Sequence, residues 1–251
     1  MRRIIFATLL LGLSLSGCAQ MAPPYHPLKV SREEFFAKTK VVALAPLVIG
    51  VNADKPEAIK TQVESALGQK LEELGLAVIP SKEYQEIWER LSKQIGGAFD
   101  PITGKRDDAK VKTLIGYVSN ELRTKHNADA LLHPMIQPVK APFNAGNARW
   151  HGTAEAVAPE GFWNKFLMGE SRGTTSALSL IVTIENMNGV DLYVQAGGIQ
   201  VLAKLNSRRQ FVEIPRSQIL TNQQRNQAAA AIALSGLTIQ PPQDDAKQES
   251  P

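Results

Sequence analysis

The sequence predicts an α/β domain of the α+β kind, with a mixed sheet whose first half alternates strands with helices. Two features indicate this order. Lys40 to Leu47 contains a continuous apolar run, which is followed by a helical pattern and a short apolar segment, Leu76 to Ile79. Ala177 to Glu185 alternates apolar and polar residues, and Asn188-Gly189 then leads into a second alternating run. The predicted order is therefore β-α-β-α-α, then antiparallel strands with an Asn-Gly hairpin, and a closing C-terminal helix.

The composition is that of a globular protein, with 43% hydrophobic and 21% charged residues among 251. The chain has 28 basic and 24 acidic residues, and two of the basic ones, Arg2 and Arg3, lie in the first 17 residues. The remainder is nearly balanced in charge, which gives no indication of nucleic-acid binding. Residues 39–238 form one predicted domain, long enough to bury a sizeable core.

Residues 1–17 have the pattern of a secretory signal. Arg2 and Arg3 precede an apolar run, Ile4 to Leu13, which is too short to span a bilayer because a span takes about 20 apolar residues. Leu15-Ser16-Gly17-Cys18 follows, and Cys18 is the only cysteine of the chain. This stretch resembles the lipobox of bacterial lipoproteins. An ordinary secretory signal followed by an unmodified cysteine remains the alternative.

The lipobox resemblance implies that cleavage falls before Cys18 and that lipid is attached to its sulfur and its new amino group. One acyl chain binds a membrane only marginally, whereas several chains hold a protein durably, so Cys18 is the predicted membrane contact. Ala19 stands where lipoproteins retained in the inner membrane often carry aspartate. The resemblance therefore favours the outer membrane, with the domain in the periplasm.

Residues 18–38 are the expected tether, because Ala19 to Val30 is rich in proline and lacks apolar periodicity. Pro46 should end the first strand. Asp54 and Glu57 resemble a capping box at the start of the first helix, and Gly75 supplies its stop. The apolar stripe of this helix is Ile59, Val63, Leu67, Leu71 and Leu74.

Two more helices are expected. Ser81 should cap the first of them, and the second should start near Asp107 or Asp108, whose charge suits a helix N-terminus. The glycine-bearing stretch between them is not a phosphate loop, because Phe99 and Arg106 stand where glycine and serine or threonine are needed. The apolar stripes are Tyr84, Ile87, Trp88, Leu91 and Ile95, then Val111, Leu114, Ile115, Val118 and Leu122.

The second half should form an antiparallel meander. Pro134 and Pro138 place the strand Asp129 to Val139 at a sheet edge or a bulge, because proline has no backbone donor. Ala148 to Val157 is predicted as one strand. Gly197-Gly198 should mark a bulge or a close approach. The closing helix is expected to open with a capping box at Thr221 and Gln224 and to stop at Gly236. Residues 239–251 have the composition of a disordered tail.

No pattern of catalysis or cofactor binding is present in the sequence. The histidines, His26, His126, His133 and His151, lack the spacing of a metal site, so no metal is expected. No Gly-x-Ser-x-Gly occurs. The carboxylates Glu155, Glu160 and Glu170 are expected to be solvated surface groups rather than a catalytic pair. We therefore expect a protein that is not an enzyme and has no cofactor.

The segment Pro159 to Gly169 is unusual because it lies between two strands that a tight turn would connect. Phe162, Trp163 and Phe166 fall at helical spacing, and aromatic residues are enriched in interface cores. These three are the candidate partner-binding residues, with Trp150 as a neighbour that would extend the patch. The alternative for Trp150 is a position in the core. Two accounts remain open: this segment caps the end of the core, or it docks on a partner subunit or a membrane surface.

The order of elements resembles the periplasmic lipoprotein domains related to the TolB amino-terminal domain, a group that includes CsgG and LpoB. Four segments resemble proteobacterial outer-membrane lipoproteins of the same fold: Phe99 to Gly104, Ala148 to Gly152, Ala177 to Leu180 and Tyr193 to Gly198. The resemblance spans about Lys40 to Leu237 and implies a noncatalytic domain that works by binding or assembly. The long amphipathic hairpins of the curli pore have no counterpart.

The sequence thus predicts a lipid-anchored envelope protein that binds another envelope protein or a second copy of itself. A ring-forming accessory of secretion or transport is the alternative, and an enzyme is the third hypothesis.

Overall fold

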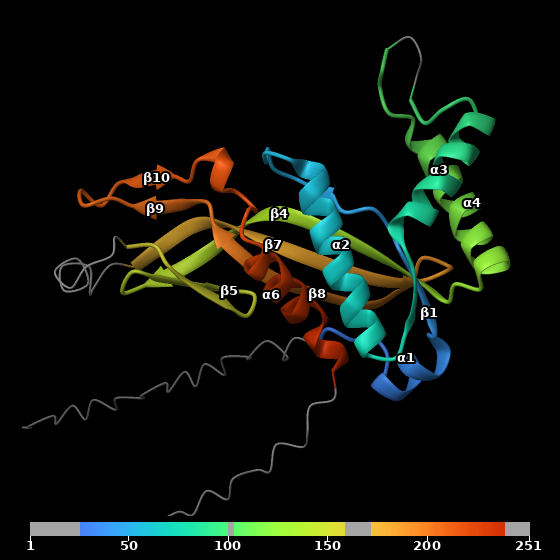
Figure 1. Ribbon diagram of the computed structural model, residues 1–251, viewed down its shortest axis with the longest axis horizontal. Helices are drawn as coiled ribbons and strands as arrows, with labels where there is room; N and C mark the ends of the chain where they lie inside the picture. The colour runs from blue at the N-terminus through green and yellow to red at the C-terminus, as the bar shows by residue number, and fades with distance from the viewer. Residues whose placement is uncertain (1–25, 100–102, 159–171, 239–251) are drawn as a thin grey trace, which may run out of the picture.

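The computed structural model describes residues 26–99, 103–158 and 172–238, and it confirms the mixed α+β class (Figure 1). Two long antiparallel strands, β4 (Ala130–Asn144) and β7 (Arg172–Asn186), pair along their whole length and form the middle of the sheet. The signal segment, Cys18, the aromatic segment at 159–169 and the tail at 239–251 lie outside the described residues.

The first half has the predicted parallel strands. β1 (Val41–Leu44) lies between β3 (Ala77–Ile79) and β4 and is parallel to both. A short strand, β2 (Val48–Ile49), follows the break at Pro46 and also pairs with β4. The helices of this half are α2 (Pro56–Glu73), α3 (Ser81–Gln94) and α4 (Asp108–His126).

Pro134 and Pro138 were predicted to place their strand at a sheet edge or a bulge. The edge is wrong, since β4 has partners on both sides, and the pairing of β4 with β7 has no register shift at either proline. The N–H groups of Ala45 and Gly50, the residues directly after β1 and β2, donate to the backbone carbonyls of Leu132 and Ile136. Alternate residues of a strand direct their backbone polar groups to the same side, so both prolines face β1 and β2. Pro134 lies opposite the break between these strands and Pro138 lies beyond β2. Neither position therefore needs an N–H donor.

The second half contains the predicted hairpin of β7 and β8 (Asp191–Val201), turned by Asn188-Gly189 with Gly189 at φ 78°. The single strand predicted for 148–157 is instead a hairpin, β5 (Asn147–Trp150) and β6 (Thr153–Ala156). His151 at φ 39° and Gly152 at φ 74° form its two-residue turn. β9 (Ala203–Leu205) and β10 (Phe211–Glu213) form a further ribbon.

Gly197-Gly198 was predicted to mark a bulge or a close approach, and the structure shows both. The pairing of β7 and β8 shifts register between Leu178 and Ser179, next to these glycines. A Cβ on Gly197 would overlap the backbone carbonyl of Ala229 in α6 (Gln223–Leu234), the closing helix. Glycine at this position therefore lets the helix backbone lie directly on the sheet. Two 3-10 turns flank α6: η1 (Arg216–Gln218) and η2 (Ser235–Leu237).

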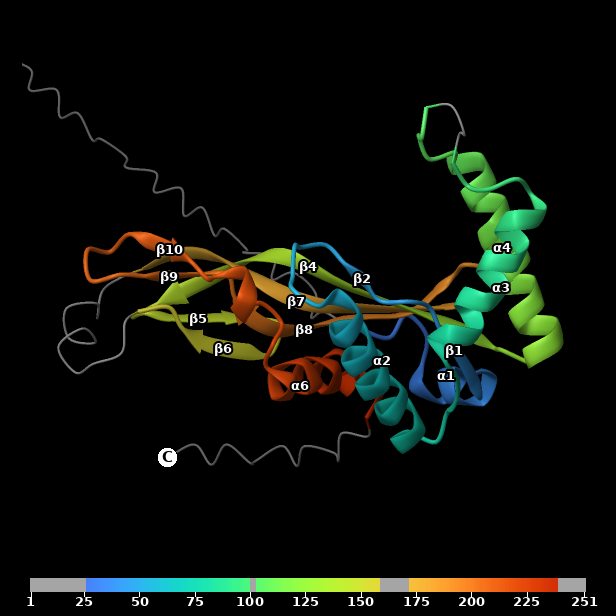
Figure 2. The same cartoon turned by 45° about the horizontal axis from the view of Figure 1, so that its top comes forward.

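Three apolar clusters hold these elements together. The largest lies between α2, α6 and one face of the sheet, and Figure 2 shows both helices on that face. A second packs α3 and α4 against the start of β4 at one end of the molecule. A third lies under β5, β9 and the far ends of β4 and β7. No helix within the described residues is both long and apolar enough to cross a bilayer.

Helix starts differ from the sequence prediction at three places. Lys55, at φ 56°, precedes α2 without a side-chain cap, because Pro56 occupies the first helical position in place of a capping box from Asp54. Ser81 is the first residue of α3, and its hydroxyl donates to Glu64. Asn222, rather than Thr221, caps α6 by accepting a hydrogen bond from the Arg225 N–H. Asp107 caps α4, as expected.

The domain begins earlier than the expected boundary at residue 39. Leu28 bridges Tyr193 of β8, and the Val194 N–H donates to the carbonyl of Pro27 at 2.9 Å. A short helix, α1 (Arg32–Lys38), follows a Ser31 cap and buries Phe35. Residues 26–38 are therefore part of the fold. Residues 18–25, the rest of the expected tether, lie outside the described ranges.

Candidate functional site

Of the residues that the sequence predicted to bind a partner, only Trp150 lies within the described part of the chain. Its side chain is 6% exposed and packs in the cluster under β5. The indole N–H donates to the carbonyl of Leu178 at 3.1 Å. Trp150 is thus a core residue and does not extend an exposed patch. Cys18, Phe162, Trp163 and Phe166 lie outside the described residues.

The described histidines with polar partners occur as separate pairs. His133 Nε2 lies 2.8 Å from Glu185 Oε1, and His151 Nδ1 lies 2.8 Å from the hydroxyl of Ser179, which is fully buried. His126 lies 3.7 Å from a carboxylate oxygen of Glu83. Within residues 26–99, 103–158 and 172–238, no three histidine, cysteine, aspartate or glutamate side chains gather as metal ligands would.

Glu155 was predicted to be a solvated surface carboxylate, but its side chain is only 9% exposed. One oxygen accepts a hydrogen bond from the Val201 N–H at 2.9 Å. The other lies 3.2 Å from Lys204 Nζ and 3.0 Å from an Arg225 nitrogen. Glu155 therefore connects β6 to β8, to the β9–β10 hairpin and to α6. Glu160 and Glu170 lie outside the described residues.

Two groups with displaced pKa values lie on α3 and α4. Burial raises the pKa of Tyr84 to about 12, and the negative charge of Glu185 adds to this effect. Hydrogen bonds from Arg90 and Lys125 lower the pKa of Glu121. Tyr84 stacks on Trp88, with ring centroids 6.2 Å apart, and faces the core. The first shift follows from burial and from a charge on β7, and the second from ion pairs that α4 makes with α3 and within itself.

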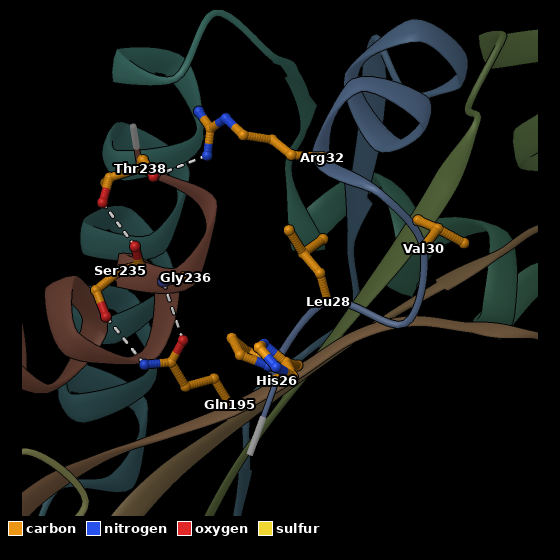
Figure 3. Close-up of a pocket in the computed structure, with 9 residues that line it drawn as sticks. His26, Leu28, Val30, Arg32, Gln195, Ser235, Gly236 and Thr238 are labelled. Carbon is orange, nitrogen blue, oxygen red and sulfur yellow. Dashed lines mark hydrogen bonds between the residues drawn. The ribbon is translucent and has the colours of Figure 1, made fainter. Parts of the chain in front are cut away.

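A cavity of about 780 Å³ lies where the start of the described chain meets its end (Figure 3). It is lined by His26, Pro27, Leu28, Val30, Arg32, Gln195, Ser235, Gly236 and Thr238. The Arg32 guanidinium donates to the carbonyls of Leu237 and Thr238, the latter at 2.8 Å. A cation at these C-terminal carbonyls is favourable, because they form the negative end of the final helical turn.

The polar groups around this cavity bond to one another. Gln195 donates to the carbonyl of Ile232 and to the Ser235 hydroxyl, both at 2.9 Å. Its oxygen accepts from the Gly236 N–H at 3.0 Å and from the Tyr193 hydroxyl at 2.6 Å. This arrangement fastens the N-terminal segment and the C-terminal turn to β8. We therefore interpret the cavity as a structural junction.

Large apolar side chains are exposed at several places on the described surface. Val48 and Met135 are cross-strand neighbours on β2 and β4. Phe99, Ile115 and Tyr117 lie on or near α4, and Val190 lies in the β7–β8 turn. Phe211 and Val212 are consecutive residues of β10, 49% and 53% exposed. Consecutive residues of a strand point to opposite faces, so the β9–β10 hairpin exposes apolar surface on both sides.

The end of the sheet that carries this hairpin is basic. We define the strand end as residues 139–158, 172–176 and 203–213, which include β5, β6, β9 and β10. Its basic residues, all exposed, are Lys140, Arg149, Arg172, Lys204, Arg208 and Arg209. Its acidic residues are Glu155, which is mostly buried and paired, and Glu213. The strand end therefore presents a net positive surface beside exposed Phe211 and Val212.

Sequence reasoning missed this surface and the N-terminal junction. The signal for the surface was Arg208-Arg209 followed by Phe211-Val212, a basic turn leading into an apolar strand. The signal for the junction was Ser31 with Glu33 and Glu34, a cap followed by acidic residues of a first helical turn.

No protein-family model and no curated protein matches this sequence. Among solved structures, the chain is similar to the PelC dodecamer from Paraburkholderia phytofirmans, at 12% identity and a TM-score of 0.35, over 84% of this chain and 92% of that one. It is also similar to the lipoprotein GNA1162 from Neisseria meningitidis, at 13% identity and a TM-score of 0.34, over 64% of this chain and 81% of that one. Both TM-scores are low, so neither likeness carries an argument about function or assembly.

Proposed function

We propose that this protein is a lipid-anchored, noncatalytic module of the bacterial outer membrane whose periplasmic domain binds another envelope protein or a second copy of itself. The supporting observation is the short distance along the chain between the lipobox cysteine and the fold. Cys18 precedes the first described residue, His26, by eight positions. Eight extended residues reach at most about 28 Å. A lipid on Cys18 would therefore keep the domain within that distance of the bilayer.

The way in which the chain enters the fold supports this role. Leu28 pairs with β8 and Arg32 binds the last turn of the domain, so the end of the chain nearest Cys18 is fixed in the sheet. A flexible linker of tens of residues would let the domain range freely, whereas this short connection limits its reach. The exposed apolar residues of β2 and β4, Val48 and Met135, are available for contacts with other proteins.

The anchor is tested by cell fractionation of the full chain. Cys18→Ser removes the acylated sulfur, so the variant should leave the membrane fraction or accumulate as unprocessed precursor. Ser16→Ala keeps a small residue at the same place in the lipobox and should remain membrane-bound, which makes it the matched control. Membrane retention and normal processing of Cys18→Ser would refute the proposed lipid anchor.

Partner binding is tested by crosslinking in cells. Replacing Phe162, Trp163 and Phe166 together with serine should abolish the crosslinked species, whereas the same change at Phe99 and Tyr117, exposed aromatics near and on α4, should not. Unchanged crosslinking of the triple variant contradicts the assignment of these residues. The mass of the detergent-solubilised wild type then distinguishes a second copy from a different protein.

A further inference from the structure

We propose that the β9–β10 hairpin is a second membrane contact, which lies on an anionic phospholipid surface beside the lipid anchor. This inference rests on the proposed function, because a lipid on Cys18 is what brings the hairpin to the bilayer. The partner is a lipid surface whose phosphate headgroups carry negative charge, and it contacts the turn 206–210 and the exposed residues of β10.

The charge of the hairpin fits such a surface. Arg208 and Arg209 are exposed in the turn between β9 and β10, and Lys204 lies across the ribbon from Val212. Arg149 and Arg172, also at the strand end, add to the positive potential. Each lysine or arginine near an anionic membrane strengthens adsorption by about fivefold. A cluster of this kind binds phosphate headgroups without a shaped pocket.

The apolar residues of the hairpin fit the interfacial layer of the same surface. Phe211 packs edge-on against Phe143, with ring centroids 6.1 Å apart, yet half of its side chain remains exposed. Val212 is exposed on the other face of the ribbon, beside Lys204. Aromatic and apolar side chains flanked by basic ones are typical of segments that lie in the headgroup region of a bilayer.

The direction of the N-terminal segment brings the anchor toward this hairpin. Leu28 pairs antiparallel with Tyr193, and the carbonyl of Pro27 accepts from the Val194 N–H, so the described chain, followed from Leu28 back to its start at His26, points along β8 toward Val201. β9 begins at Ala203, immediately beyond β8 (Figure 1). From Val194 to Val201 the strand advances about 23 Å. The eight residues before His26 have a reach of about 28 Å, so the lipid and the hairpin can contact one bilayer together.

The test uses the chain from residue 18 onward with Cys18→Ser, which carries no lipid and retains every described element. Its binding is measured by co-sedimentation with vesicles of phosphatidylcholine containing about 30% phosphatidylglycerol, and with vesicles of phosphatidylcholine alone. Binding should be stronger on the anionic vesicles and should fall when salt is raised from about 0.1 M to about 0.5 M. The double variant Arg208→Gln, Arg209→Gln should bind about 25-fold more weakly.

The matched control removes two exposed lysines from the opposite end, Lys82→Gln on α3 and Lys112→Gln on α4. It changes the net charge by the same amount and should weaken binding much less. Equal binding to both kinds of vesicle, or equal weakening by the two double variants, overturns the proposal. If the vesicle experiment contradicts the proposal while the protein is still anchored in cells, only the hairpin contact is refuted and the lipid anchor stands. Loss of anchoring at Cys18 leaves this measurement unchanged, because the tested chain has no lipid.

Discussion

The two ends of the β4–β7 pair are assembled differently. At the helical end, defined as α3, α4 and the start of β4, successive segments of the chain pack on one another and supply most of the second apolar cluster, which Ala43 and Ala45 complete. The third cluster lies at the strand end and next to it, and it is assembled from three separate parts of the chain: 139–158, Ala177 and 201–214. The helical end thus depends on local contacts, whereas the strand end depends on distant parts of the chain meeting.

The two ends also differ in how their charged side chains are arranged. On α3 and α4, Glu121 pairs with both Arg90 and Lys125, and Lys82 lies 3.7 Å from Glu86. At the strand end, the main carboxylate is Glu155, which is turned inward and already paired. Opposite charges at the helical end therefore satisfy one another within the chain. The strand end leaves basic and apolar groups facing outward, which is the pattern of a contact surface.

Two glycine-to-alanine substitutions should change the free energy of unfolding in opposite directions. Gly197 is in close contact with α6 on the crowded face of the sheet, whereas Gly116 on α4 borders open space. Gly197→Ala should destabilise the fold by about 3 kcal/mol, because its Cβ would overlap the carbonyl of Ala229. Gly116→Ala in α4 should instead stabilise it by up to about 1 kcal/mol, because the new Cβ meets open space and alanine favours the helix. Urea unfolding of both variants measures the difference, and effects of the same sign would contradict this packing account.

Glu155→Gln tests whether one carboxylate holds the strand end together. The variant keeps an acceptor for the Val201 N–H but removes the negative charge between Lys204 and Arg225. We expect a loss of about 2 kcal/mol in the free energy of unfolding. Hydrogen exchange should increase in β9 and β10 and stay unchanged in α3 and α4. A uniform increase along the chain would show that Glu155 acts on global stability alone.

Glu121→Gln is the matched change at the helical end and should have the smallest effect. Its partners lower the pKa of Glu121 below the ordinary value of 4.5, so the carboxylate stabilises the fold above that pH. This contribution is lost as the pH falls through the folded-state pKa. The variant should lose less than about 1 kcal/mol at neutral pH, because the partners Arg90 and Lys125 are 46% and 65% exposed and solvent screens both pairs. The free energies of unfolding of the variant and the wild type are measured near pH 7 and near pH 3. The difference between the two proteins should be smaller at pH 3, and an unchanged difference would contradict a stabilising ion pair.

The helical half could be predicted from the sequence because its signals are local. Most residues of the three predicted stripes are buried as their spacing indicates, and Gly75 follows α2 with φ 80°. The exceptions are Leu74, Trp88 and Ile95, which are half-buried, and Ile115, which is exposed. Cap residues were less predictable, since several polar residues precede each helix. At the start of α6, Thr221 and Asn222 are adjacent, and only the structure shows which one bonds to the Arg225 N–H.

The strand half was harder to predict, because the position of a strand in the sheet depends on which other strands pair with it. Pro134 is tolerated in a central strand only because β1 and β2 leave a gap opposite it. His151-Gly152 makes the turn usually signalled by Asn-Gly, so one strand was predicted where there are two. For the candidate site, the sequence supplied Cys18 but left Trp150 open between a surface patch and the core, because burial by segments that meet only in the fold leaves no local pattern.

The central claim is that the domain is held to a bilayer by lipid on Cys18. Mass spectrometry of the N-terminal peptide from the membrane-extracted protein tests this most directly. We expect a peptide that begins at Cys18 and carries diacylglycerol on the sulfur and a fatty acyl group on the amine. A peptide with an unmodified Cys18, from a protein that fractionates with the soluble periplasm, would contradict the claim.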